Sequence, residues 1–257
     1  MEYARLKLIS SSIADLFNHG YFMLFIGTIF ISFMVKRLIT ITEDGSHTVL
    51  AQELNEHYHS THGALQESRH VFIEAGLHQA CRIPGEINML EIGFGTGLNV
   101  LLTLADHAIE GHTINYTALE PYPLQAELAA ELNYTAFAGL EPFQEAFLKM
   151  HRQPFGIREE IRELFYFTKE KVKAEKSGLP ASTYQLVYFD AFSPNIQPEL
   201  WSEEVFQSMY ACMKPGGILV TYCAKGIVKR TLKGVGFCVE SLPGPPGKFQ
   251  MTRAIKE

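Results

Sequence analysis

The stretch LEIGFGTGLNVLL, residues 90–102, places three alternating glycines, Gly93, Gly95 and Gly97, between two apolar runs. The apolar residues before the glycines predict a buried strand, and those after them predict a helix. Glycine adopts positive φ without strain and lets a ligand approach the backbone without meeting a Cβ atom. In an α/β sheet, ligands bind beyond the carboxyl ends of the strands, beside turns of this kind. We therefore predict an α/β fold with a ligand site at this turn.

Apolar segments continue to alternate with helical patterns along the rest of the chain. Strands are predicted within residues 87–94, 112–121, 161–172, 184–192 and 216–222, and two closing strands within 236–244 and 248–257. Helices are predicted within residues 98–108, 124–132, 141–150, 198–213 and 224–235. This order predicts a mainly parallel sheet covered on both faces, with a C-terminal antiparallel hairpin.

The amino-terminal part divides into an apolar extension, residues 1–35, and a segment of the main domain, residues 36–85. Residues 36–51 alternate around the turn EDGS and predict a β-hairpin, and residues 56–80 have helical spacing. The unbroken apolar run of the extension, residues 21–35, is 15 residues long. A spanning helix needs about 20. Insertion in a membrane and a dispensable extension upstream of a domain start near Met34 are both open, and the second is our prediction.

The charge of the chain is unevenly distributed. The net charge is −6, yet residues 214–257 hold eight Lys and Arg against two Asp and Glu. Lys225, Lys229 and Lys233 have i,i+4 spacing and are joined by Arg230, which predicts a basic helix face that could hold RNA phosphates. The alternative is a solvated face. The four cysteines form no CxxC pair, which favours reduced thiols in a cytoplasmic protein.

The spacing of the glycines bears on the ligand. A dinucleotide turn has the spacing GxGxxG, whereas here the third glycine comes one residue early and position 98 is Leu. Glu91 would repel a pyrophosphate but suits a ligand with an ammonium group, such as S-adenosylmethionine (SAM). Glu120 ends the second strand and can accept hydrogen bonds from ribose hydroxyls. Glu120 is equally compatible with NAD, so an NAD-dependent oxidoreductase is a rival interpretation.

A carboxylate also follows the fourth predicted strand, in DAFSPNIQPELW, residues 190–201. Asp190 would stand at the carboxyl end of the sheet, where it could orient an amine or receive its proton. Pro194 and Pro198 stiffen the loop behind Asp190. The alternative is a structural Asp that precedes a helix.

Three histidines, His57, His59 and His62, lie close together in HYHSTH. A metal site would also need carboxylates or an accepting second layer of residues. Because only Glu53 and Glu56 are nearby, we predict that no metal binds and that Tyr58 lines the substrate mouth.

Several motifs together resemble a known family. YHSTHGALQESRHVF, LEIGFGTGLN, LEPYPL, YFDAFSPNIQPELW, KPGGILVTY and the closing GPPGK occur in this order. Between about Lys36 and Lys256, the chain resembles the methyltransferase domain of MnmC and its stand-alone form. The resemblance implies the Rossmann-like fold of SAM-dependent methyltransferases. It also implies methylation of 5-aminomethyl-2-thiouridine to 5-methylaminomethyl-2-thiouridine at the wobble position of tRNA.

The resemblance also implies roles for individual residues. It places Asp190 beside the transferred methyl group and lets Glu67 close over the ligand. After the third strand, where family members usually have an acidic residue near the adenine, this sequence offers Thr168 and Lys169. The residues implied to bind SAM are Glu67, Glu91, Gly93, Phe94, Gly95, Thr96, Gly97, Asn99, Glu120 and Asp190.

The implied partner is tRNA, with Tyr58 and the basic residues of 225–233 as candidate contacts. The sequence holds none of the flavin-dependent oxidase that two-domain family members carry, so we expect methyl transfer alone, without flavin or metal, and leave open a separate oxidase partner. Two alternatives remain: N-methylation of a small amine or a protein, and a SAM-binding module without catalysis.

Overall fold

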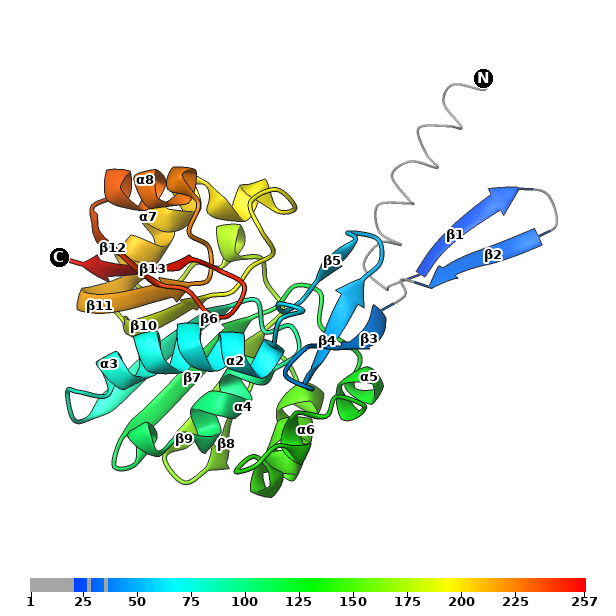
Figure 1. Cartoon of the computed structure of the whole chain (residues 1–257), viewed down its shortest axis with the longest axis horizontal. Coiled ribbons are helices and arrows are strands. Elements are labelled where there is room, and N and C mark those ends of the chain that lie inside the picture. The colour runs from blue at the N-terminus through cyan, green and yellow to red at the C-terminus, as the bar shows by residue number, and fades with distance from the viewer. Residues whose placement is uncertain (1–20, 27–28, 35–36) are drawn as a thin grey trace.

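The structure is a computed structural model that describes residues 21–26, 29–34 and 37–257. Its main feature is an eight-stranded sheet in the order β12-β13-β11-β10-β6-β7-β9-β8 (Figure 1). The five central strands from β11 to β9 are parallel, and both edges are antiparallel. The strands are β6 (Glu86–Ile92), β7 (Thr113–Leu119), β8 (Arg158–Arg162), β9 (Phe165–Glu170), β10 (Tyr184–Phe189), β11 (Met213–Thr221), β12 (Phe237–Pro243) and β13 (Gln250–Lys256). The predicted fold class and C-terminal hairpin are confirmed.

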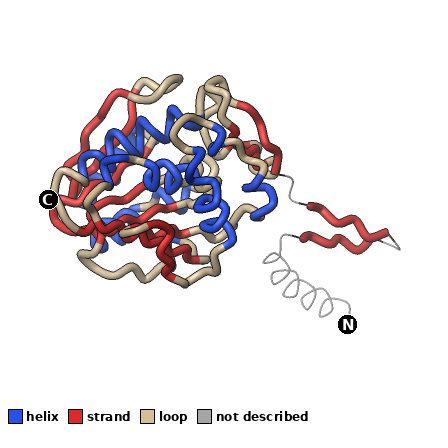
Figure 2. Tube along the Cα trace, turned by 90° about the horizontal axis from the view of Figure 1, so that it is seen from below, coloured by secondary structure: helices blue, strands red, loops and turns tan. Residues whose placement is uncertain are grey.

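Helices cover both faces of this sheet (Figures 1 and 2). Strand β10 is accordingly apolar on both of its faces. Leu186 and Tyr188 are buried in one apolar cluster, and Val187 and Phe189 are buried in the other. Side chains alternate along a strand, so a strand buried on both faces reads as a continuous apolar run. The helices are α2 (Ala64–Ser68), α3 (His78–Ala80), α4 (Leu98–Ala105), α5 (Ala126–Ala130), α6 (Gln144–Arg152), α7 (Glu203–Cys212) and α8 (Gly226–Val235).

A small second sheet precedes the main one. It contains β3 (Arg37–Ile41), β4 (His47–Ala51) and β5 (Glu56–His57), all antiparallel. The predicted hairpin is confirmed, but the helical pattern predicted from residue 56 begins later. Glu56 and His57 pair with Ala51 and Leu50 of β4, and the helical turns run from α2 through a π-helix, Arg69–Leu77, into α3. Tertiary pairing thus decides the conformation of two residues that the local pattern assigns to a helix.

Within the apolar extension, β1 (Tyr21–Ile26) and β2 (Ile29–Met34) pair as antiparallel strands. The membrane-spanning alternative required one helix over this run. Among the residues that the structure describes, none of the helices has the length and apolar character needed to cross a bilayer. Residues 1–20, 27–28 and 35 of the extension, and residue 36 of the main domain, lie outside the described residues.

Two further predictions differ in detail from the structure. The single strand predicted within residues 161–172 is preceded by an antiparallel partner, so that β8 and β9 form a hairpin at the edge of the sheet. Leu164 makes the turn with φ of +63°, which apolar side chains rarely adopt and which the pattern does not signal. The helix predicted from residue 224 begins at Gly226, because Lys225 has the extended backbone of a capping residue.

Candidate functional site

A cavity of about 1640 Å³ lies at the carboxyl ends of β6, β7, β9 and β10. This is where an α/β sheet presents its ligand site. The segment from β3 to α2 closes one side, and Lys248 in the turn between β12 and β13 lines it too. Of the predicted site residues, the cavity is lined by Tyr58, Glu67, Gly93, Phe94, Gly95, Thr96, Glu120 and Asp190. The predicted residues that do not line the cavity are Glu91, Gly97, Asn99, Lys225, Lys229, Arg230 and Lys233.

Two glycines of the turn are required because other parts of the chain pack against them and because their φ angles are positive. Gly93 has φ of +91°, and a Cβ atom there would lie 2.5 Å from the backbone oxygen of Asp190. Gly97 has φ of +73°, and a Cβ atom would lie 2.7 Å from Nε2 of His151. The turn from β6 is therefore packed directly against the loop that follows β10. The close approach predicted for a ligand is also a close approach between two parts of the chain.

Glu120 lies at the end of β7 with both carboxylate oxygens directed to backbone donors. The amide of Gly95 donates to Oε2 at 2.8 Å, and the amide of Tyr122 donates to Oε1 at 2.7 Å. Burial raises the pKa of Glu120. A carboxylate offers about four lone pairs, so these bonds leave capacity for hydroxyl donors of a ligand. Glu120 thus both holds the glycine turn and faces the cavity.

Asp190 is joined to a second buried acid through one amide. Nδ2 of Asn99 donates to Oδ2 of Asp190 at 2.7 Å and to Oε1 of Glu91 at 2.9 Å. Burial raises the pKa of Asp190 to about 7 and the pKa of Glu91 well above its usual range. Glu91 is fully buried behind Asp190 and does not line the cavity. The direct contact between Glu91 and a ligand ammonium, expected from the sequence, has no counterpart in the cavity wall.

Two neutral histidines support the glycine turn through Thr96, and one of them, His59, also lines the cavity. Nε2 of His59 lies 2.6 Å from Oγ1 of Thr96, and Nε2 of His151 lies 3.1 Å from the carbonyl oxygen of Thr96. Burial lowers the pKa of both rings to about 4, so both are neutral near pH 7. The sequence predicted a substrate mouth at Tyr58 and no metal. His59, the neighbour of Tyr58, lines the cavity and also supports the glycine turn.

Lys169 is turned into the core. Its Nζ donates to the carbonyl oxygens of Met150 at 3.0 Å and His151 at 2.7 Å. Burial lowers the pKa of Lys169. Neither Thr168 nor Lys169 lines the main cavity; the wall beyond β9 is formed by residues 171–175. Strand alternation places Lys169 on the buried face of β9 with Phe165 and Phe167, and the loop that follows β9 lines the cavity instead.

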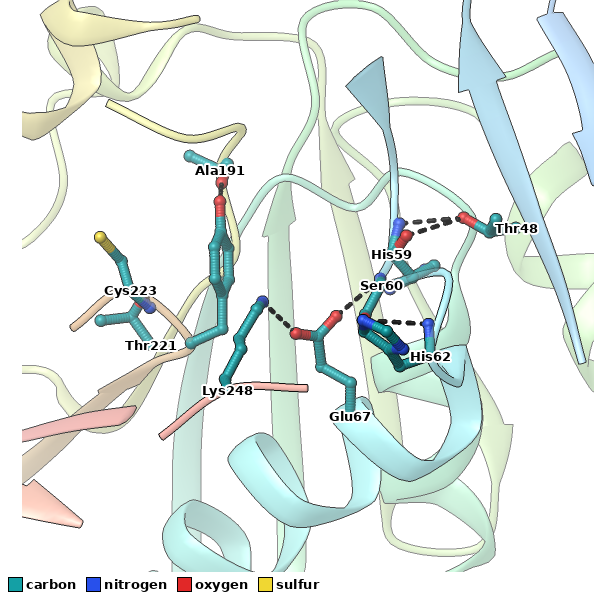
Figure 3. Close-up of polar contacts among 10 residues, drawn as sticks. Thr48, His59, Ser60, His62, Glu67, Ala191, Thr221, Cys223 and Lys248 are labelled. Carbon is teal, nitrogen blue, oxygen red and sulfur yellow. Dashed lines mark hydrogen bonds and ion pairs between the residues drawn. The ribbon is translucent and has the colours of Figure 1, made fainter. Parts of the chain in front are cut away.

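A cluster of contacts closes the cavity on the side of Asp190 (Figure 3). Glu67 accepts a hydrogen bond from the amide of Ser60 at 2.8 Å and forms an ion pair with Lys248. Lys248 Nζ also lies 4.0 Å from the centre of the Tyr222 ring, whose hydroxyl donates to the Ala191 carbonyl at 2.9 Å. Sequence reasoning assigned no role to Lys248, although the closing GPPGK motif contains it.

Tyr58 lies over the glycine turn, as predicted for a residue at the mouth. A Cβ atom on Gly95 would lie 3.0 Å from Cδ1 of Tyr58, and the Tyr58 ring packs edge-on against Phe192 with centroids 5.0 Å apart. Nε of Arg37 donates to the Tyr58 hydroxyl at 3.3 Å. The amino-terminal segment and the loop after β10 therefore meet above the turn.

The three histidines of HYHSTH do not converge. His59 contacts Thr96, whereas Nδ1 of His62 lies 3.0 Å from Oε1 of Glu43 on the surface. Within the residues that the structure describes, no group of three or more His, Cys, Asp or Glu side chains is arranged to hold a metal.

The basic residues of 225–233 lie outside the cavity wall. Nζ of Lys225 donates to Asn195 at 2.8 Å, and Nζ of Lys229 donates to Ser241 at 2.7 Å and to Gln250 at 3.0 Å. Arg230 and Lys233 are exposed. Lys225 precedes the helix, and Lys229 is directed to the C-terminal hairpin. Contact of these basic residues with RNA stays a prediction.

Comparison with known proteins identifies the chain's relatives. Residues 143–257 match a family described as S-adenosyl-L-methionine-dependent methyltransferase. The tRNA 5-methylaminomethyl-2-thiouridine biosynthesis bifunctional protein MnmC of Cupriavidus necator is 35% identical over 212 residues, which cover 77% of this chain and 31% of the relative. MnmC of Magnetococcus marinus is 32% identical over 215 residues, which cover 78% of this chain and 31% of that protein. The chain thus spans about a third of the length of these curated relatives.

A solved structure agrees with these matches. The crystal structure of MnmC2 from Aquifex aeolicus superposes with a TM-score of 0.72 at 26% identity, covering 86% of this chain and 70% of that one. The resemblance drawn from the sequence motifs is confirmed, and the description of the matched family names SAM as the cofactor.

Proposed function

We propose that this chain, which belongs to the family of the MnmC methyltransferase domain, transfers a methyl group from SAM to the primary amine of 5-aminomethyl-2-thiouridine at the tRNA wobble position. The observation that carries the proposal is Asp190, a buried acid with a raised pKa, beside a glycine turn on a large cavity. Such a group can exchange a proton with an amine near neutral pH.

The cavity residues fit SAM. Glu120 retains acceptor capacity for ribose hydroxyls, and Gly93 and Gly95 of the glycine turn line the cavity beside it. Phe94 and Thr96 line the same wall, with Gly97, Asn99 and Glu91 behind it in support. We assign the adenine contact to residues 171–175 rather than to Thr168 or Lys169.

In this proposal, Asp190 orients the acceptor amine and receives the proton that the amine loses. SAM, when bound, would supply a methyl group on a positively charged sulfur, with a neutral thioether as the leaving group. The protein's main contribution is then alignment and proton removal. Asn99 holds Asp190 in place through its amide.

The names of the curated relatives describe bifunctional proteins, and this chain spans about a third of them. We propose that residues 36–257 perform the methyl transfer, in the cytoplasm, without metal or flavin, and that an oxidase supplies the primary amine. Tyr58 would border the entrance for the anticodon nucleotide, and the exposed basic residues of α8 would contact the tRNA backbone.

The test is nucleoside mass spectrometry of tRNA that carries 5-aminomethyl-2-thiouridine, incubated with the protein and methyl-deuterated SAM. We expect one deuterated methyl group on the wobble nucleoside, and none on tRNA that lacks the aminomethyl group. Transfer to a small amine or a protein, with none to tRNA, would replace this proposal by the first alternative. SAM binding without any transfer would favour a non-catalytic module.

A further inference from the structure

The end of β12 and the turn between β12 and β13 contact the amino-terminal segment, residues 36–85, at three points. A Cβ atom on Gly247 would lie 2.2 Å from Cδ2 of His62, so the backbone of the turn rests on that ring. Nε2 of His70 lies 2.8 Å from the carbonyl oxygen of Pro243. The third point is the ion pair between Lys248 and Glu67. Segments nearly two hundred residues apart in sequence thus meet at the rim of the cavity.

Lys248 is the point at which this contact reaches the cavity. Its ammonium pairs with Glu67, whose side chain is 7% exposed, and lies over the Tyr222 ring. Glu67 accepts a hydrogen bond from the amide of Ser60. The hydroxyl of Tyr222 donates a hydrogen bond to the carbonyl of Ala191, the residue that follows Asp190. Figure 3 shows Lys248 between the Glu67 side and the Ala191 side. One side chain therefore links the amino-terminal segment to the loop of Asp190.

We propose that Lys248 is a positioning residue for the methyl-transfer reaction: it joins the two walls around Asp190 and places a positive charge beside the carboxylates of the acceptor end. This inference rests on the proposed amine methylation. Lys248 itself transfers no group. It acts through Glu67, which it neutralises, and through Tyr222, which it packs against the loop of Asp190.

The charges around Asp190 make this role measurable. The acidic and phenolic groups that face Asp190 are Glu67 from α2, Glu91 from β6, Tyr116 from β7 and Tyr222 after β11. Burial is the main cause of the raised pKa of Asp190; the charge of Glu67 raises it further and that of Lys248 lowers it. Removing Lys248 both deletes a favourable charge and leaves Glu67 unneutralised.

The experiment measures the pH dependence of kcat/KM for methylation of tRNA by four forms of the full chain: wild type, Lys248→Met, Glu67→Gln and the double variant. Lys248→Met keeps an apolar stem over Tyr222 but loses the charge. The acidic limb of the kcat/KM profile of Lys248→Met should move up by about one pH unit. The reason is that the pKa of Asp190 rises when the opposite charge is lost, and a nearby opposite charge shifts a carboxyl pKa by at least about one unit. Glu67→Gln should move the limb down, and the double variant should return towards the wild type.

Two controls separate this role from a purely structural one. Lys248→Arg should restore the wild-type limb, and Lys149→Met, which breaks a surface pair with Glu159 at 3.2 Å, should not move it. SAM affinity of Lys248→Met, measured by calorimetry, should stay within about threefold of the wild type. Lower kcat at all pH values with an unmoved limb would overturn the inference.

A second measurement does not need turnover. The ¹³C shift of the Asp190 carboxyl, assigned with Asp190→Asn, should titrate about one pH unit higher in Lys248→Met than in the wild type. An unmoved titration overturns the inference even where methylation is normal. A moved titration in a protein that methylates no tRNA would instead overturn the proposed function and leave the coupling between Lys248 and Asp190 standing.

Discussion

The glycine turn and helix α8 were both singled out by the spacing of a few residues, yet they differ in how the structure uses them. At the turn, Gly93, Glu120 and Asp190 come from three strands and meet at one cavity. At α8, Lys225, which precedes the helix, and Lys229 donate to nearby neutral side chains; Lys229 is half-buried, whereas Lys225, Arg230 and Lys233 are exposed.

The difference has a physical cause. The carboxyl ends of parallel strands lie along one edge, so residues at these ends converge whatever their separation in sequence. A helix face has no such constraint, since each long side chain bonds to whatever acceptor lies within reach. Spacing is therefore a better guide to a site at a sheet edge than to one on a helix surface.

The largest expected effect lies at the sheet edge. Asp190→Asn keeps the shape of the side chain but removes its capacity to take a proton. The rate of methyl transfer should fall by roughly 10²–10⁴, the range for loss of a general base. Calorimetry should still detect SAM binding; a variant with unimpaired turnover would remove Asp190 from the mechanism.

Gly93→Ala should be the next largest. The added Cβ atom would lie 2.5 Å from the backbone of Asp190, and φ of +91° is already unfavourable for alanine. Gly111→Ala is the matched control, because Gly111 has φ of +80° with nothing within 4 Å of a Cβ atom. Urea unfolding should show a loss of about 1–2 kcal/mol for the control, the strain of a left-handed residue, and a larger loss for Gly93→Ala. Equal losses would mean that the packing of the turn against the Asp190 loop contributes nothing.

The pH dependence of stability sharpens the description of Asp190. Its pKa in the folded protein is raised to about 7 from the usual value near 4. Stability linked to this group is therefore present below about pH 4 and is lost as the pH rises through 7. Asp190→Asn has no such group, so its melting temperature should rise relative to the wild type between these pH values. A constant difference in melting temperature from pH 4 to 8 would contradict the raised pKa.

The smallest effects are expected on α8. Arg230→Ala and Lys233→Ala should each weaken tRNA binding and reduce the slope of log affinity against log salt by about 0.7–0.9 if each contacts one phosphate. Lys229→Met should instead lower the melting temperature and leave the slope unchanged, because its ammonium already bonds Ser241 and Gln250. If the slope drops for Lys229→Met alone, the comparison between the two regions fails.

Most of the fold and the centre of the site could be predicted from local patterns. Continuous apolar runs such as that of β10 predict strands buried on both faces, which is typical of a parallel sheet covered by helices. The turn at Gly93, Gly95 and Gly97 and the acid at Asp190 follow directly from the strands that carry them. These features need only the sequence because strand order and periodicity position them.

Tertiary structure alone decided which of these groups face the cavity. Glu91 lies near the end of β6 and Asp190 directly follows β10, but Glu91 is fully buried against Asn99, whereas Asp190 lines the cavity wall. His59 is close to His62 in the sequence, but it bonds Thr96 and lines the cavity, whereas His62 pairs with Glu43 on the surface. Lys248 meets Glu67 from 181 positions away. Side-chain contacts between distant segments depend on how the elements pack, and no local pattern of residues encodes that packing.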